Sequence, residues 1–169
     1  MDILHQGVNV GNLQWKKLSD TVACLRIKGM SYDTKSYNSA DEEAYREMKD
    51  EVRSTILRYQ SEGVKDVIID LRDNNGGSPH MVNGIVSMFA PKGEHYCCTN
   101  GVWDEKKQCW AKDENGDYIR GGDITFKGED ILEGGRVIVI VNANSVSAAD
   151  VMTKEMESMD NARVIGFTL

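Results

Sequence analysis

VIIDLRDNNGGS, residues 67–78, joins a short apolar run to a turn that carries two adjacent glycines. A continuous apolar run such as residues 67–69 is typical of a buried strand in a parallel sheet. Glycines directly after a strand allow backbone conformations and close approaches that a Cβ would block. The stretch therefore predicts a strand that ends near Asp70 and a sharp loop at the strand's carboxyl end.

The rest of the chain alternates between strand and helix patterns around this stretch. We expect strands over 21–27, 67–69, 136–141 and 163–165, and helices over 44–59, 81–89 and 147–158. Residues 93–127 mix aromatic and polar residues with Asn-Gly pairs, which predicts an antiparallel excursion made of hairpins. This order predicts an α/β fold with right-handed crossovers, in which functional loops gather at the carboxyl ends of the strands.

Composition excludes several classes of protein. The chain has 169 residues, 40% of them hydrophobic, and a net charge of −7. Such a charge argues against a nucleic-acid partner, because phosphate binding needs clustered Lys and Arg. We see no apolar run long enough to span a membrane and no Cys/His spacing typical of a zinc site, so we expect no metal. Cys97 or Cys98 could pair with Cys109 across a hairpin, and free thiols are the alternative.

A second loop could carry chemistry at the end of the strand over 136–141. RVIVIVNANSVSAAD, residues 136–150, places Ser147 after a strand and at the start of a helix, where the helix dipole favours developing negative charge. The amide of Ala148 could then donate to an oxyanion, and an amide of the Gly-Gly turn could be the second donor. Each motif also has a purely structural interpretation: Ser147 with Asp150 is an ordinary capping pair, and the glycines suit any tight turn.

Taken together, the two stretches resemble the C-terminal processing (tail-specific) serine protease family. In that family a strand ends in Asp-Leu-Arg-x-Asn-x-Gly-Gly, and an Asn-containing loop downstream leads to Ser-Ala at a helix start. The resemblance runs from about residue 18 to the C-terminus. It implies a crotonase/Clp-protease-like core of ββα units with a β-hairpin excursion, a polypeptide substrate and no cofactor. It assigns the nucleophile to Ser147 and the oxyanion hole to the backbone N–H groups of Gly76 or Gly77 and of Ala148.

The general base of the family has no counterpart in the chain. A serine hydroxyl needs a base to take its proton, and in the family a lysine roughly twenty-five residues after the serine does so. That position lies past Leu169, and neither Lys127 nor Lys154 is a credible substitute. We therefore expect little activity from the 169-residue form. His80, which follows the Gly-Gly turn, is the candidate for an alternative base, because histidine titrates near neutrality.

Other interpretations stay open at this point. The chain could be a non-catalytic module that binds a peptide or another ligand on the same fold. An acyl-CoA enzyme of the crotonase superfamily would use the same two amides, but the context of Ser147 disfavours it. We expect residues 1–169 to be a single, partial protease core domain without a PDZ domain. An exposed final strand could pair with a second copy to give a homodimer. Family members are usually proteins of the cell envelope or secreted proteins, and the substrate stays undetermined.

Overall fold

The computed structural model describes residues 9–10, 12–30 and 42–166. Its centre is a six-stranded sheet in the order β1-β2-β3-β4-β9-β10. The strands are β1 (Asn9–Val10), β2 (Leu13–Lys17), β3 (Val22–Ile27), β4 (Asp66–Asp70), β9 (Val137–Val141) and β10 (Ala162–Gly166). The last four pair in parallel, while β2 is antiparallel to β1 and β3. The predicted α/β class with a mostly parallel sheet is confirmed.

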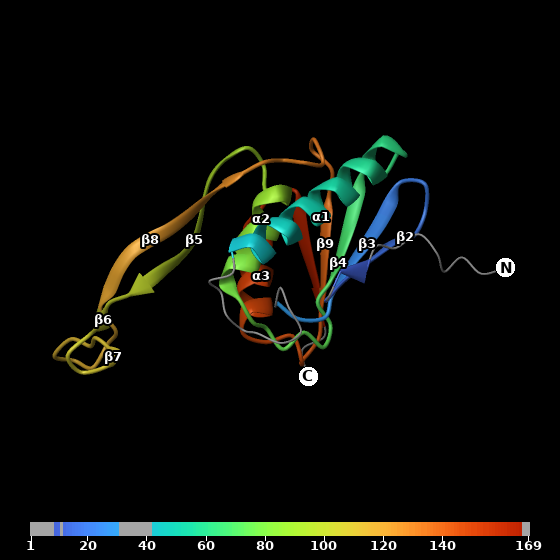
Figure 1. The fold of residues 1–169 in the computed structure, drawn as a ribbon. Coiled ribbons are helices and arrows are strands. Elements are labelled where there is room, and N and C mark those ends of the chain that lie inside the picture. Colours follow the sequence, from blue (N-terminus) through green and yellow to red (C-terminus); the bar gives the residue numbers. More distant parts are fainter. Residues whose placement is uncertain (1–8, 11, 31–41, 167–169) are drawn as a thin grey trace.

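Three helices cover one face of this sheet, as Figure 1 shows: α1 (Glu42–Ser61), α2 (Pro79–Phe89) and α3 (Ala148–Glu157). Alternate side chains of the strands point into the core beneath them, and Leu25, Ile69 and Val139 have no exposed surface. Burial of each such side chain contributes about 1.5–3 kcal/mol to folding. The apolar runs of the sequence are therefore the strands that hold the sheet against the helices.

The antiparallel excursion is a ribbon that extends away from the body of the protein (Figure 1). Its long strands β5 (Gly93–Gly101) and β8 (Arg120–Gly128) pair with each other, and β6 (Trp103–Asp104) pairs with β7 (Cys109–Trp110) near the tip. The predicted excursion is thus confirmed. Cys109 is an exposed free thiol and Cys24 is also free, so Cys109 takes no part in a hairpin disulfide.

The sequence predicted strand β10 at one end of the sheet but not strand β2 near the other end. Strand β2 was not predicted, although Leu13 and Trp15 are buried and alternate with polar residues. Strand β10 lies at an edge of the sheet and, among the strands that the structure describes, pairs with β9 alone, as expected for an exposed final strand. The homodimer that such an edge could form stays a prediction.

Candidate active site

The two loops singled out in the sequence start side by side, because β4 and β9 are neighbouring parallel strands. Asp70 is in register with Ile140, and the amide of Leu71 donates to the carbonyl of Ile140 at 2.8 Å. The first loop, residues 71–78, leads into α2, and the second loop, residues 142–147, leads into α3. Both helices thus begin at the carboxyl edge of the sheet, where parallel sheets place their ligands.

Ser147 has a backbone conformation that an ordinary helix cap does not require. It occupies the N-cap position of α3 with φ 60° and ψ −119°, and its side chain makes no capping hydrogen bond. A positive φ at a non-glycine residue stores about 1–3 kcal/mol of strain and persists only where the surroundings impose it. Ser147 is exposed on a sharp strand-to-helix turn. The capping-pair interpretation of Ser147 is therefore not what the structure shows.

The first glycine of the first loop lies against the second loop, and the next glycine lies against Met30. A Cβ on Gly76 would lie 2.6 Å from the Cβ of Ser147 and 2.9 Å from the amide nitrogen of Ala148. A Cβ on Gly77 would lie 2.3 Å from the carbonyl oxygen of Met30. Both glycines also have positive φ, at 89° and 138°. The structure therefore brings Gly76 together with Ser147 and Ala148, and only glycine fits at this contact, whereas the neighbouring Gly77 lies against Met30.

Asn74 holds this contact from inside the protein. Its side chain is fully buried, donates to the carbonyl of Ile27 at 2.8 Å and accepts from the amide of Gly76 at 2.8 Å. Its backbone carbonyl accepts from the amide of Val146 at 3.0 Å. One residue thus joins the end of β3, the Gly-Gly turn and the residue that precedes Ser147. Asn74 was not predicted to have this role, although it lies within the motif that ends in the two glycines.

The backbone amide of Gly76 has a hydrogen-bond acceptor, but two other backbone amides near Ser147 have none within the described part of the chain. Among the residues that the structure describes, the amides of Gly77 and Ala148 have no hydrogen-bond acceptor. Ala148 opens α3, and the first N–H groups of a helix have no partner within it. Gly77 lies just before α2, so the positive ends of two helix dipoles meet at the site. This arrangement favours an oxyanion that forms beside Ser147.

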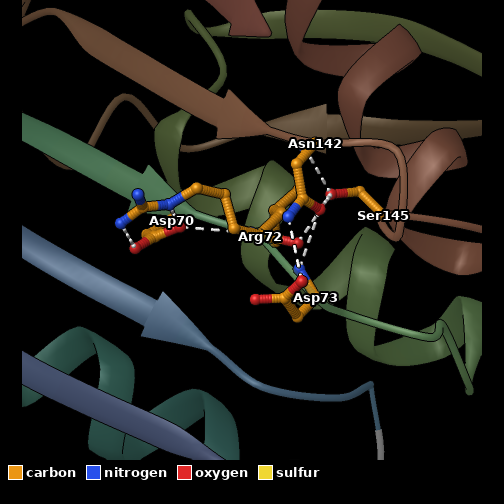
Figure 2. A network of polar contacts seen from close by, with 6 residues as sticks. Asp70, Arg72, Asp73, Asn142 and Ser145 are labelled. Carbon is orange, nitrogen blue, oxygen red and sulfur yellow. Dashed lines mark hydrogen bonds and ion pairs between the residues drawn. The ribbon is translucent and has the colours of Figure 1, made fainter. Parts of the chain in front are cut away.

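A polar network ties the two loops together, and Figure 2 shows its centre. The amide of Asp73 donates to the Oδ1 atom of Asn142 at 3.0 Å. The Asp73 carboxylate accepts from the side-chain amides of Asn142 and Asn144, both at 2.9 Å. The buried hydroxyl of Ser145 donates to the carbonyl of Leu71 at 2.8 Å. These hydrogen bonds were not predicted from the sequence.

Asp70 and Arg72 pair with each other at the end of β4. The Arg72 guanidinium makes two hydrogen bonds to the Asp70 carboxylate, at 2.9 and 2.7 Å (Figure 2). These bonds hold the pKa of the Asp70 carboxyl below its usual value. Asp70 is buried while the Arg72 side chain is 52% exposed. The pair braces the start of the first loop.

The side chains considered as bases for Ser147 are exposed on three separate elements. His80 is exposed in the first turn of α2, and Lys127 and Lys154 are exposed on β8 and α3. In the described ranges, none of these groups makes a hydrogen bond to the Ser147 hydroxyl. The same ranges contain no cluster of three or more His, Cys, Asp or Glu residues suited to a metal ion. None of the helices described is long and apolar enough to cross a membrane.

Comparison with known proteins gives a family match and related sequences. The family model "Peptidase family S41" matches residues 21–168. A protein of Staphylococcus haemolyticus named "Probable CtpA-like serine protease" is 27% identical over 116 residues, which cover 69% of this chain and 21% of that protein. A protein of Staphylococcus epidermidis with the same name is 26% identical over 116 residues, with the same coverage. The chain thus spans about a fifth of the length of these relatives.

Solved structures share the fold. A protein from Parabacteroides merdae that is assigned as a peptidase superposes with a TM-score of 0.67 at 16% identity, over 96% of this chain and 45% of that one. The photosystem II D1 C-terminal processing protease superposes with a TM-score of 0.62 at 14% identity, over 93% of this chain and 36% of that one. At these identities the likeness shows the fold alone, and this fold is the one expected from the sequence.

Proposed function

Because this chain belongs to peptidase family S41, we propose that it carries the nucleophile and the oxyanion hole of a serine endopeptidase that hydrolyses polypeptides. The observation that supports this function most directly is the contact between Gly76 and Ser147. It places a strained, exposed serine beside two helix N-termini that offer amides without acceptors. Such preorganised donors act where charge develops in the transition state.

In the proposed reaction the Oγ atom of Ser147 attacks the scissile carbonyl carbon while a base takes the hydroxyl proton. The carbonyl oxygen becomes an oxyanion and accepts hydrogen bonds from two backbone amides. The C–N bond then breaks, the base returns the proton to the leaving amine, and an acyl-enzyme remains on Ser147. A water molecule that gives its proton to the same base hydrolyses the ester and frees the serine.

The amides of Gly77 and Ala148 are our choice for the oxyanion hole. The sequence left Gly76 and Gly77 as alternatives. The amide of Gly76 already donates to the side chain of Asn74 at 2.8 Å, whereas that of Gly77 bonds no acceptor among the described residues. We therefore propose that Gly76 makes room for Ser147, and that Gly77 and Ala148 bind the oxyanion.

The proposed base is a lysine that follows Leu169 in a longer form of the protein. The resemblance to C-terminal processing proteases places it roughly twenty-five residues after Ser147, where burial would keep its amine neutral. His80 is the alternative base within the chain.

The function is tested by polypeptide hydrolysis in two forms of the protein, the 169-residue chain and a form extended past Leu169 by the segment that follows it in the parent sequence. We expect the extended form to cleave an unfolded polypeptide, the Ser147→Ala variant to lose this activity, and the exposed control Ser158→Ala to keep it. The 169-residue form should be nearly inactive. If the extended form binds polypeptides without Ser147-dependent cleavage, a binding module replaces the peptidase. Robust cleavage by the short form that His80→Ala abolishes would assign the base to His80.

A further inference from the structure

We propose that Asp73 is a positioning residue for Ser147, because its carboxylate holds the loop that ends in the serine against the Gly-Gly loop. The family motif Asp-Leu-Arg-x-Asn-x-Gly-Gly leaves the position of Asp73 open, so this role does not follow from the motif. The proposal rests on the proposed function of Ser147 as a nucleophile. Its test therefore includes a measurement that does not depend on catalysis.

The contacts of Asp73 all reach across to the second loop. Its Oδ1 atom accepts one hydrogen bond from the Nδ2 atom of Asn142 and one from that of Asn144, each at 2.9 Å. Its backbone amide donates to the Oδ1 atom of Asn142 at 3.0 Å. Asp73 and Asn142 thus bond each other in both directions, although they lie 69 residues apart in the sequence. This reciprocal pair fixes where the second loop leaves β9.

The hold of Asp73 extends along the second loop toward Ser147. The Oδ1 atom of Asn142 also accepts from the amide of Asn144 at 3.2 Å, and the amide of Asn142 donates to the hydroxyl of Ser145 at 3.0 Å. The Ser145 hydroxyl in turn donates to Leu71 at 2.8 Å, beside the start of the first loop. Every residue from 142 to 146 except Ala143 is therefore bonded to this network or to Asn74. Ser147 follows this bonded segment directly and forms the strained turn.

Charge and backbone conformation both suit aspartate at this position. A carboxylate only accepts hydrogen bonds, so it can receive two amide donors without an orientation conflict, and charge-assisted bonds are stronger than neutral ones. The bonds from Asn144 and Asn142 lower the pKa of the Asp73 carboxyl, so it is ionised at neutral pH. Asp73 also has φ 63°, a left-handed conformation that Asp and Asn tolerate better than most residues.

Two substitutions separate the acceptor from the backbone conformation. Asp73→Gly removes the acceptor but accepts φ 63° without strain, whereas Asp73→Asn keeps an acceptor oxygen and tolerates this φ. In the extended form, we expect Asp73→Gly to lower the rate at which a fluorophosphonate labels Ser147 by about tenfold. We expect Asp73→Asn to restore the rate to within about threefold of the wild type. In polypeptide hydrolysis, kcat should fall with Asp73→Gly while KM stays nearly unchanged.

Amide hydrogen exchange of the 169-residue chain supplies the measurement that does not depend on catalysis. Asp73→Gly should speed exchange at Asn144 and Val146, while the amides of β9 keep their protection. If the wild type shows no Ser147-dependent labelling but exchange responds in this way, the proposed function fails and the hold on the loop stands. Equal labelling of the wild type and Asp73→Gly would overturn the positioning role. Equal losses in Asp73→Gly and Asp73→Asn that track global unfolding would also overturn it.

Discussion

Gly76 and Ser147 lie so close that a Cβ on the glycine would come within 2.6 Å of the Cβ of the serine. Carbon atoms that are not bonded to each other do not come this close. Any side chain at residue 76 must therefore displace the turn that contains Ser147. The second loop is also anchored to the first by the hydrogen bond from the amide of Val146 to the carbonyl of Asn74. The position of the proposed nucleophile therefore depends on the absence of a side chain at Gly76.

Gly76→Ala should displace Ser147, and Gly116→Ala is a matched control. Gly116 has φ 86°, close to the 89° of Gly76, but a Cβ there would meet no atom within 4 Å. Both variants carry the cost of a left-handed alanine, about 1–2 kcal/mol. Only Gly76→Ala adds a steric overlap with Ser147. Urea unfolding should therefore show a larger loss of unfolding free energy for Gly76→Ala than for Gly116→Ala. In the extended form it should also lose fluorophosphonate labelling. Equal losses of stability in the two variants would show that the overlap is relieved without cost.

Asn74→Ala should destabilise the protein more than Asn75→Ala. Asn74 is buried and its side chain bonds Ile27 and Gly76, so its loss leaves buried polar groups without partners. That loss costs about 1–3 kcal/mol for each such group. The neighbouring Asn75 is exposed, and its substitution should change stability by about 0.5 kcal/mol or less. Urea unfolding of the two variants measures the difference, and similar values would contradict the role of Asn74 as the link between the loops.

Acid should weaken the fold through Asp70. The hydrogen bonds from Arg72 hold the pKa of the Asp70 carboxyl below its usual value. A carboxyl with a lowered pKa in the folded state contributes stability that is complete above its unfolded pKa, about 3.9, and is lost as the pH falls through the folded value. We therefore expect Asp70→Asn to be less stable than the wild type at neutral pH and to lose less stability on acidification below about pH 4. Unfolding measured against pH tests this expectation, and parallel curves for the two proteins would contradict it.

Asp66→Asn provides a comparison for the acid effect. Arg136 lowers the pKa of Asp66 in the same manner, but the Arg136 side chain is 77% exposed and Asp66 is less buried than Asp70. Because exposed ion pairs contribute little to stability, Asp66→Asn should flatten the acid response less than Asp70→Asn. The reverse order would show that burial of the carboxylate does not decide the effect.

The two cysteines whose side chains the structure describes should differ in reactivity. Burial, and then the charge of Asp70, raise the pKa of the Cys24 thiol, which lowers the fraction of reactive thiolate. Cys109 is exposed near the tip of the ribbon. Iodoacetamide at mildly alkaline pH should therefore modify Cys109 well before Cys24, as followed by peptide mass mapping. Equal rates in the folded protein would contradict the protection that partial burial on β3 gives Cys24.

Much of the fold could be predicted because its strands carry continuous apolar runs. Residues 67–69 and 136–141 became β4 and β9, which are adjacent parallel strands. Strand β2 was missed because only Leu13 and Trp15 mark it, and two alternating apolar residues are a weak signal. Its antiparallel pairing with β3 stabilises the strand, and the local sequence does not reveal this pairing.

The site was predictable in outline but not in its hydrogen bonds. Strand ends and helix starts placed Ser147 and the Gly-Gly turn at one edge of the sheet. Asp73, Asn74 and Asn142 were not assigned roles, because Asp and Asn are common in turns for purely local reasons. Their roles depend on contacts between residues far apart in the sequence, such as Asp73 with Asn144 and Asn74 with Val146, and no spacing rule captures such contacts. The φ of Ser147 likewise results from packing against Gly76, which a local pattern does not contain.

If Ser147 is the nucleophile, a fluorophosphonate should modify it. The mass of the modified peptide then identifies the residue that has reacted. The form extended past Leu169 is treated with the reagent, digested and mapped, with Ser147→Ala and Ser158→Ala treated in parallel. We expect one phosphonyl adduct on the peptide that contains Ser147, its loss in Ser147→Ala, and its retention in Ser158→Ala. An extended protein that is folded yet carries no adduct on Ser147, or carries it on another residue, would contradict the account.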